Sequence, residues 1–438
     1  MARAAGTKNT QADTAVLEQF RSMHIELRNL YHVCPTITSS SEQDLLQTAI
    51  CSVLDRLEAT AGYPRKRLEL LTVCYGIDSY LYLHGQAPSQ SWKDVYQRMN
   101  GMFWKLARDV ADQDWTSGLL CEQLRLDPLG WHLPLVVGAG DFFDDAHLRF
   151  VVSRFEAFAK GVEPSSLRDS YLYLAGFISR VIDQFDDFTQ YMLELAENDP
   201  SAVQCLYVAD CYADDAPEKA LDWLGRLSGK ELSGAQQVNR LRIQRTCFHV
   251  LEDYRKEESV ARELFRRRYC LSDAKQLFDC VPYDRWDEVL AQEIAYCFDT
   301  PEIHPGMMLF VSRYTDFATL DRYVLSHVDG LNEFAYSEFA HSDILPHAMN
   351  LAERGYHASA TVLYRDLILN ILVRKLGEPF LSRGCEYLVL LNSLARRIHS
   401  WKCIGFSHLQ FLRFLKKNYS DRDDFWRLYD ERCADLVV

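Results

Sequence analysis

The sequence predicts an all-α fold of stacked antiparallel helix pairs, an α-solenoid of the tetratricopeptide-like kind. Apolar residues recur at three-to-four spacing along almost every segment, which is the period of a helix with one buried face. Glycine and proline are scarce, with 20 and 13 among 438 residues, against average usage of roughly 7% and 5%. Prolines stand where they start or stop helices, as at Pro128, Pro217 and Pro379.

The amphipathic pattern runs from near residue 16 to the C-terminus. In 151–160, for example, Val151, Phe155 and Phe158 share one face, and Arg154 lies off it. Segments of roughly 10 to 20 residues with short connections predict antiparallel neighbours. The predicted helices are 16–32, 43–60, 66–83, 93–110, 168–184, 201–212, 217–227, 236–254, 258–269, 285–298, 343–353, 356–376, 384–399, 406–417 and 423–433.

The segment 201–228 is typical of a tetratricopeptide-like helix hairpin. Small and aromatic residues such as Ala209 and Tyr212 precede an Asp-Asp-Ala-Pro turn, and a second apolar-patterned run follows Pro217. One helix pair cannot bury its apolar face alone, so the hairpin predicts stacked neighbours. The hexapeptide at 78–83 recurs at 169–174, which suggests that two early helices play equivalent roles.

The helices at 356–376 and 384–399 are predicted to form a buried antiparallel hairpin. Gly377 and Pro379 supply its short turn. Arg365 is expected on the surface of this hairpin. The apolar residues expected to meet across its seam are Leu363, Leu367, Ile371, Leu388, Leu391 and Leu394.

Four regions are predicted along the chain. Residues 1–14 are polar and are expected to be a disordered N-terminus. The others are an N-terminal helical region at 15–125, a helical-repeat region at 126–340 and a C-terminal helical unit at 341–438.

The net charge of −14 and the pI near 5.4 oppose long-range attraction to nucleic acid or to anionic lipid surfaces. No segment reaches the ~18 uninterrupted apolar residues of a spanning helix, and the N-terminus has no apolar core of a signal peptide. The 13 cysteines form no Cys-x-x-Cys pair. A cytoplasmic protein without a membrane partner is therefore expected.

Acidic clusters recur at Asp141–Asp145, Asp183–Asp187, Asp210–Asp215 and Asp421–Asp424. Each precedes a predicted helix, where Asp side chains accept hydrogen bonds from free amides. Capping is therefore favoured over cation binding, because no further ligand accompanies any cluster.

Histidines at 341, 347 and 357 with Cys385 and Cys403 do not have the ligand spacing of closed zinc sites. No glycine-rich phosphate loop and no nucleophile with its base is recognisable. We therefore expect no metal, no cofactor and no catalytic activity.

The basic residues at 240–268 form the candidate nucleic-acid or acidic-partner surface, with Arg262, Arg266, Arg267 and Arg268 at its end. Glutamates interleave these arginines, which favours a solvated face with (i, i+4) ion pairs.

The C-terminal part contains the run at 347–357, the sequence Leu363-Tyr364-Arg365-Asp366-Leu367, and further on Trp401 and Phe425-Trp426. In these residues it resembles an uncharacterised bacterial family of helical-repeat proteins. The resemblance covers roughly 200–435 and implies a tetratricopeptide-like array. In that family such a tail also occurs with a SWIM-type zinc finger, whose Cys-x-Cys and Cys-x-His elements are absent here. The resemblance implies no catalytic residues.

These observations predict a non-catalytic scaffold or adaptor that binds another protein or peptide. The possible partner-binding residues are Arg262, Arg266, Arg267, Arg268, Tyr364 and Arg365. The alternative is a nucleic-acid-associated regulator that uses the basic 240–268 region. An enzyme with a pocket between helices would require a cluster of titratable groups in a cleft.

Overall fold

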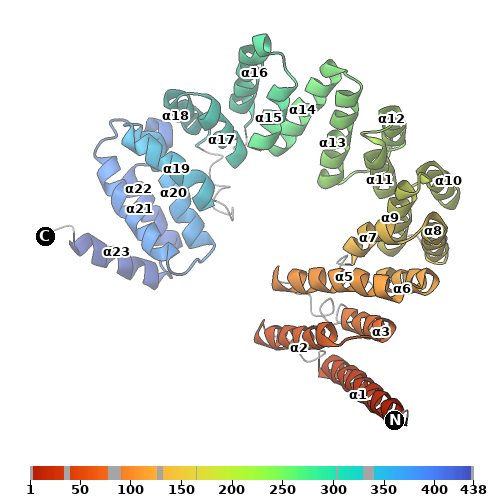
Figure 1. Ribbon diagram of the computed structural model, residues 1–438. Coiled ribbons are helices and arrows are strands. Elements are labelled where there is room, and N and C mark those ends of the chain that lie inside the picture. Colours follow the sequence, from red (N-terminus) through yellow and green to blue (C-terminus); the bar gives the residue numbers. More distant parts are fainter. Residues whose placement is uncertain are drawn as a thin grey trace. The chain divides into compact units, whose positions relative to one another are not determined.

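The computed structural model describes residues 3–33, 40–76, 90–125, 132–163, 165–301, 304–328 and 340–435. Over these ranges it holds 22 α-helices, two short 3-10 helices and no strand (Figure 1). The all-α prediction is confirmed. No helix in this part of the chain is both long enough and apolar enough to cross a membrane.

The chain divides into two compact units, unit 1 at Met1–Tyr207 and unit 2 at Val208–Val438. This division differs from the predicted boundaries at 126 and 341. The first helix begins at Arg3, within the stretch 1–14 that was expected to be disordered. Alanine and glutamine in this stretch have high helix propensity, which polarity alone does not reveal.

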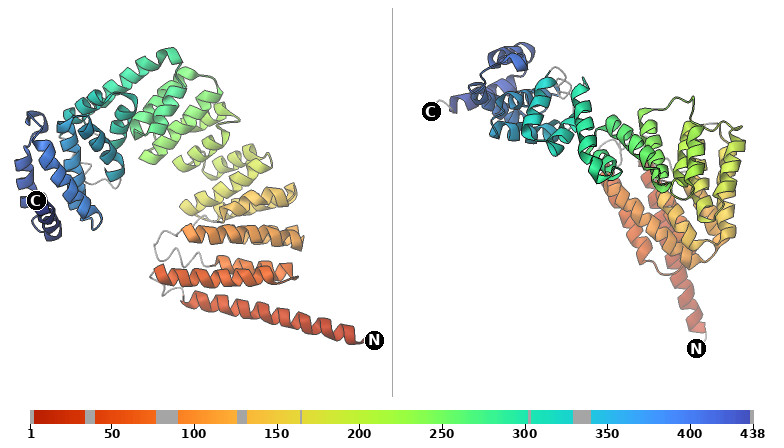
Figure 2. Two further views of the ribbon diagram at one scale, coloured as in Figure 1. Left: turned by 60° about the vertical axis from the view of Figure 1, so that its left-hand side comes forward. Right: turned by 90° about the horizontal axis from the view of Figure 1, so that it is seen from above.

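Unit 1 is built from helices that pack on near neighbours in the chain, such as α1 on α3, α3 on α5 and α8 on α9 (Figure 2). Apolar side chains such as Phe103 and Phe155 fill the space between them and are fully buried. The recurring segment 78–83 lies outside the described residues. The helices are α1 (Arg3–Val33), α2 (Ser40–Ala59), α3 (Pro64–Tyr75), α5 (Gln90–Val110), α6 (Gln113–Arg125), α7 (Leu133–Phe142), α8 (Asp145–Lys160), α9 (Ser166–Val181), α10 (Phe185–Leu195) and α11 (Ala202–Tyr212), the last of which continues into unit 2.

Unit 2 continues the same pattern, with α13 packing on α14 and α19 on α20. Its helices are α12 (Pro217–Gly225), α13 (Gly234–Val250), α14 (Tyr254–Arg268), α15 (Leu271–Asp279), η2 (Tyr283–Arg285), α16 (Trp286–Asp299), α17 (Pro305–Tyr314), α18 (Phe317–Ser326), α19 (Ala340–Glu353), α20 (His357–Val373), α21 (Phe380–Ala395), η4 (Lys402–Ile404), α22 (His408–Asn418) and α23 (Asp423–Asp435).

Helix α20 lies at the centre of unit 2. Every residue from Ser359 to Leu372 is buried, because α18, α19, α21 and η4 all pack against this helix. The predicted α20–α21 hairpin is confirmed, and the six leucine and isoleucine residues expected at its seam all belong to the buried core. The expectation that Arg365 is a surface residue is wrong, because this side chain is only 7% exposed.

Helix capping follows the acidic clusters only in part. Asp144 caps α8 by accepting a hydrogen bond from the backbone N–H of His147 at 3.0 Å. The N-cap residue of α10 is instead Gln184 and that of α12 is Ala216, and neither residue makes a side-chain capping bond. The prediction that every cluster is a set of caps is therefore wrong for these two helices.

Candidate binding surface of unit 2

Two of the predicted basic residues, Arg262 and Arg266 of α14, neutralise a buried carboxylate of α16. Glu293 is fully buried, and Arg266 donates to it from Nε at 2.8 Å and from Nη2 at 3.0 Å. Arg262 contacts the same carboxylate and also pairs with Glu258 at 2.9 Å. These guanidinium groups connect α14 to α16, so much of their charge is compensated within the fold.

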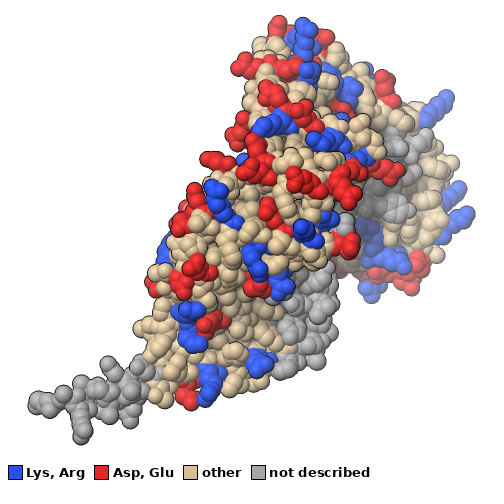
Figure 3. Space-filling model, turned by 90° about the vertical axis from the view of Figure 1, so that its right-hand side faces the viewer, with Lys and Arg blue, Asp and Glu red and all other residues tan. Residues whose placement is uncertain are grey.

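The other two predicted arginines of α14 are also ion-paired. Arg267 pairs with Glu263 at 3.0 Å, one helical turn away, and both side chains are about half exposed. Arg268 pairs at 3.3 Å with the buried Asp273 of α15. The structure therefore brings the four arginines onto one helix and gives each a carboxylate partner. On the face shown in Figure 3, Lys and Arg are likewise interspersed with Asp and Glu.

The structure places Tyr364 and Arg365 in the core. Tyr364 is 3% exposed, and burial raises the pKa of its hydroxyl to about 12. The guanidinium carbon of Arg365 lies 4.8 Å from the ring centroid of Phe411 and 5.4 Å from that of Trp401. Burial lowers the pKa of Arg365 to about 10, which still leaves the group charged at neutral pH.

The next residue of α20, Asp366, is also buried, at 4% exposure. Burial raises the pKa of this carboxyl group well above its ordinary value, although the nearby Arg365 opposes the shift. Neither Tyr364 nor Arg365 therefore offers an exposed polar group to a partner.

A different basic stretch stands out at residues 387–420. No Asp or Glu occurs in it, although the whole chain is strongly acidic. We name it the acid-free segment; it runs from within α21 through η4 and α22. Its six Lys and Arg side chains make no ion pair with any carboxylate in the described part of the chain. They are Arg396, Arg397, Lys402, Arg413, Lys416 and Lys417.

Four of these six cations lie at helix C-termini, where the helix itself stabilises positive charge. Arg396 and Arg397 follow the C-terminus of α21, and Lys416 and Lys417 lie in the last turn of α22. The partial negative charge at a helix C-terminus stabilises such cations by roughly 0.3–1 kcal/mol each. That interaction does not neutralise a full charge, so the cations remain available to an anionic partner.

A groove of about 760 Å³ lies along α21 beside Arg432 of α23. Arg396 and Arg397 are exposed at this groove, while Arg432 pairs with Glu386 at 3.0 Å. We call it the α21–α23 groove. Its lining residues are Glu386, Val389, Leu390, Asn392, Ser393, Arg396, Arg397 and Arg432.

The polar floor of this groove is held by hydrogen bonds from two other helices. The amide oxygen of Asn392 lies 2.7 Å from Nε2 of His408, and its amide nitrogen donates to the Tyr429 hydroxyl at 3.2 Å. Burial, followed by the charge of Arg365, lowers the pKa of His408 to about 4. A neutral His408 therefore holds Asn392 in place at physiological pH, and the groove is preformed.

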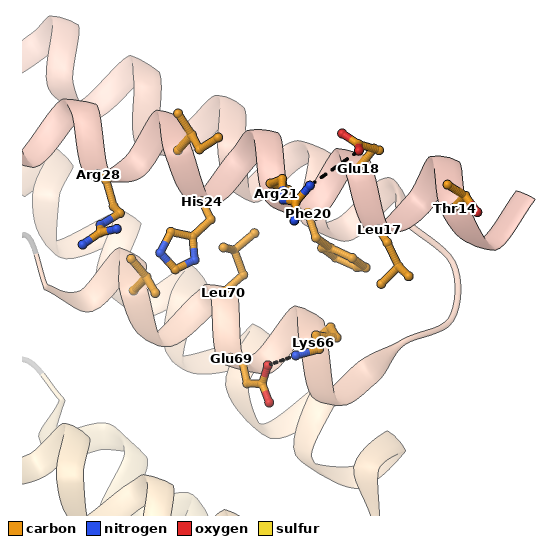
Figure 4. A pocket seen from close by; sticks show the side chains of 12 residues that line it. Thr14, Leu17, Glu18, Phe20, Arg21, His24, Arg28, Lys66, Glu69 and Leu70 are labelled. Atoms are coloured by element: carbon orange, nitrogen blue, oxygen red, sulfur yellow. Dashed lines mark hydrogen bonds and ion pairs between the residues drawn. The ribbon is translucent and has the colours of Figure 1, made fainter.

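Unit 1 contains a groove of about 680 Å³ between α1 and α3 (Figure 4). Leu17 and His24 of α1 line it, together with Lys66 and Glu69 of α3. Lys66 pairs with Glu69 at 2.8 Å, and Leu17 is 49% exposed. This groove offers an apolar surface with less unpaired charge than the α21–α23 groove.

The residues considered for metal binding or nucleophilic chemistry are not gathered into a reactive cluster. Within the described ranges, no group of three His, Cys, Asp or Glu side chains is placed to hold a metal ion. Burial raises the pKa of Cys121, Cys297 and Cys385 to about 12, which disfavours the nucleophilic thiolate.

No family model, curated protein or solved structure matches this chain. The resemblance of residues 200–435 to a bacterial helical-repeat family therefore stays a prediction. Function has to be inferred from the surfaces of the two units.

Sequence reasoning missed the acid-free segment because it compared local densities of Lys and Arg. By that measure 240–268 is the richest region, yet glutamates offset its charge. Net charge over a window of about 30 residues would have identified 387–420 instead.

Proposed function

We propose that this protein is a non-catalytic helical-repeat scaffold that binds an acidic segment of another protein in the α21–α23 groove. One observation carries the proposal. Arg396 and Arg397 are exposed at the groove and have no carboxylate partner, within a segment that contains no acidic residue. An acidic partner would supply the missing counter-charges.

The repeat architecture in this proposal is supported by the order of packing. In the described part of the chain, helices in extensive contact are separated in sequence by at most two others. Nearest-neighbour packing of this kind is typical of arrays of helix pairs, which commonly bind peptides or proteins on their surfaces.

The chemistry of the groove favours an amphipathic peptide. Val389 and Leu390 supply half-buried apolar surface beside the two arginines. Helical peptides commonly place their apolar face in such a groove and keep charged side chains at the rim. A segment with leucines on one face and glutamates beside them would satisfy both parts of the groove.

The alternative, a nucleic-acid-associated regulator that uses 240–268, has less support at the 262–268 end of that region. Arg262, Arg266, Arg267 and Arg268 already pair with carboxylates of the same unit. Phosphate contacts would have to replace these ion pairs, three of which involve the buried carboxylates of Glu293 and Asp273. Such a replacement costs desolvation and pairing energy.

The proposal is tested by fluorescence anisotropy with a labelled helical peptide that carries leucines at i and i+4 and glutamates between them. We expect the full-length protein to bind it and to lose affinity as salt is raised. The double substitution Arg396→Glu and Arg397→Glu should weaken binding by on the order of tenfold or more.

A peptide with lysines in place of the glutamates is the control for charge, and Arg267→Glu is the control for a basic residue elsewhere in unit 2. Equal binding of both peptides, or equal loss of affinity in the Arg267 variant, would show that the groove is not the acidic-peptide site.

A further inference from the structure

The exposed side of α22 forms a surface separate from the residues that line the α21–α23 groove. Phe411 and Leu415 point into the core of unit 2. On the opposite side, Leu409, Arg413 and Lys416 recur at i, i+4 and i+7 and therefore share one face. We use the name α22 face for the set of Phe406, Leu409, Arg413, Lys416 and Lys417.

Two large apolar side chains of the α22 face are open to solvent. Phe406 is 60% exposed and Leu409 is 58% exposed. Phe406 follows Gly405, whose φ of 71° lies in the left-handed region, in the short turn that joins η4 to α22. Neither residue lines the α21–α23 groove. Phe406 projects from this turn and Leu409 projects from the first turn of α22, so a flat surface can reach both side chains.

Basic side chains flank this apolar pair. Arg413 and Lys417 are exposed and make no ion pair in the described part of the chain, and Lys402 precedes the turn. The ammonium group of Lys416 lies 5.5 Å from the ring centroid of Trp426. Since Arg413 and Lys402 are not in the last turn of α22, helix-terminus electrostatics does not account for them.

We infer that the α22 face docks unit 2 on anionic lipid bilayers, with Phe406 and Leu409 entering the interface and the basic residues close to the headgroups. Apolar side chains beside lysines and arginines are the pattern of interfacial helices. A phosphate backbone alone gives Leu409 no favourable contact, whereas the acyl boundary of a bilayer does. The net charge of −14 implies short-range docking without long-range attraction.

The test is co-sedimentation of the full-length protein with vesicles of equal parts phosphatidylglycerol and phosphatidylcholine, and with vesicles of phosphatidylcholine alone. We expect binding to the anionic vesicles only. The triple variant R413E/K416E/K417E should bind on the order of 100-fold more weakly, because each cation near an anionic surface contributes roughly a factor of five. The variant F406S/L409S should bind roughly tenfold more weakly.

The matched control is K93E/K105E/R108E, which reverses three exposed cations of α5 and should bind as the wild type does. All variants alter exposed side chains, and their helical circular dichroism and thermal midpoints should match those of the wild type. Equal sedimentation with both kinds of vesicle, or equal binding by the triple variant, would overturn the inference.

Binding to a mixed-sequence oligonucleotide tests whether the α22 face binds nucleic acid instead of lipid. If the wild type leaves the anionic vesicles unbound while the triple variant loses affinity for the oligonucleotide, then the α22 face is a nucleic-acid surface and the lipid inference is wrong. The groove variant R396E/R397E keeps Arg413 and both lysines of the α22 face. Its effect on peptide binding therefore tests the proposed scaffold function independently.

Discussion

Arg365 shows how tertiary packing can reverse an expectation for a single residue. It was expected on the surface of the predicted hairpin, yet it is only 7% exposed. Its Nε and Nη2 atoms have no hydrogen-bond partner in the described part of the chain. The rings of Trp401 and Phe411 cover it, which compensates part of the desolvation cost.

Substitution of Arg365 separates its volume from its charge. Arg365→Met keeps most of the length and removes an unpaired buried cation, so the free energy of unfolding should stay within about 1 kcal/mol of the wild type or rise. Arg365→Ala should lower it by about 2–4 kcal/mol, because a cavity remains. Urea denaturation measures both values. An equal and large decrease in the free energy of unfolding of the two variants would mean that the charge of Arg365 itself stabilises unit 2.

His147 provides a pH-dependent contact in unit 1. Its Nδ1 lies 2.7 Å from Asp144 and its Nε2 lies 3.1 Å from Asp114. The hydrogen bond with Asp144 raises the pKa of His147. Since the folded-state pKa exceeds the unfolded value, the stabilisation is complete below the unfolded pKa of about 6.5 and is lost as pH rises through the folded pKa.

His147→Gln should therefore lower the thermal midpoint near pH 5.5 and leave it almost unchanged near pH 8.5, where both forms of the protein lack the charge. Thermal unfolding followed by circular dichroism at the two pH values checks this. The same decrease at both pH values would instead assign His147 a packing role only.

At the scale of elements, the α20–α21 hairpin depends on close packing of its leucines. Leu367 is fully buried at the seam. Leu367→Ala should lower the free energy of unfolding by about 2–5 kcal/mol, because the four elements around α20 cannot collapse into the space. Leu409→Ala, at an exposed position, should change it by no more than about 0.5 kcal/mol. Similar effects of the two changes would contradict the assignment of the core.

The α14–α16 contact depends on a buried charge. Glu293→Gln should lower the free energy of unfolding by about 2–4 kcal/mol, because it leaves Arg262 and Arg266 without their shared carboxylate. Glu263→Gln breaks only the exposed pair with Arg267 and should cost at most about 0.5 kcal/mol. Chemical denaturation of both variants compares them. A smaller loss for Glu293→Gln than for Glu263→Gln would exclude this account of α14.

Helix periodicity predicted most of the helices, and for the hairpin also their pairing, but the predicted ranges do not include α6, α7, α10, α15, α17 or α18. The apolar residues at 363, 367 and 371 and the Gly377–Pro379 turn located α20 and α21 in the sequence. The burial of Ser359, Asp366 and Asn370 on the other sides of α20 was not predictable. Their polarity indicates solvent, and only the packing of α18, α19 and η4 around the helix determines otherwise.

At the scale of the molecule, charge is informative only where its pairing is known. The arginines at 262–268 are densely spaced in the sequence. Their ion-pair partners Glu293 and Asp273 lie on other helices, α16 and α15, so sequence spacing could not reveal these partners. The acid-free segment could have been predicted, because the lack of Asp and Glu over 387–420 is a property of the sequence. The groove beside it required the packing of α23.

The most direct measurement of the scaffold proposal is photo-crosslinking in the native host, with a photoreactive residue at Ser393 in the α21–α23 groove or at the exposed Arg255 of α14. A partner protein should crosslink from Ser393, lose the crosslink in the R396E/R397E background, and contact the groove through an acidic segment. Crosslinks to nucleic acid or protein from position 255 alone, with none from position 393, would contradict the scaffold proposal and would place the binding site on α14.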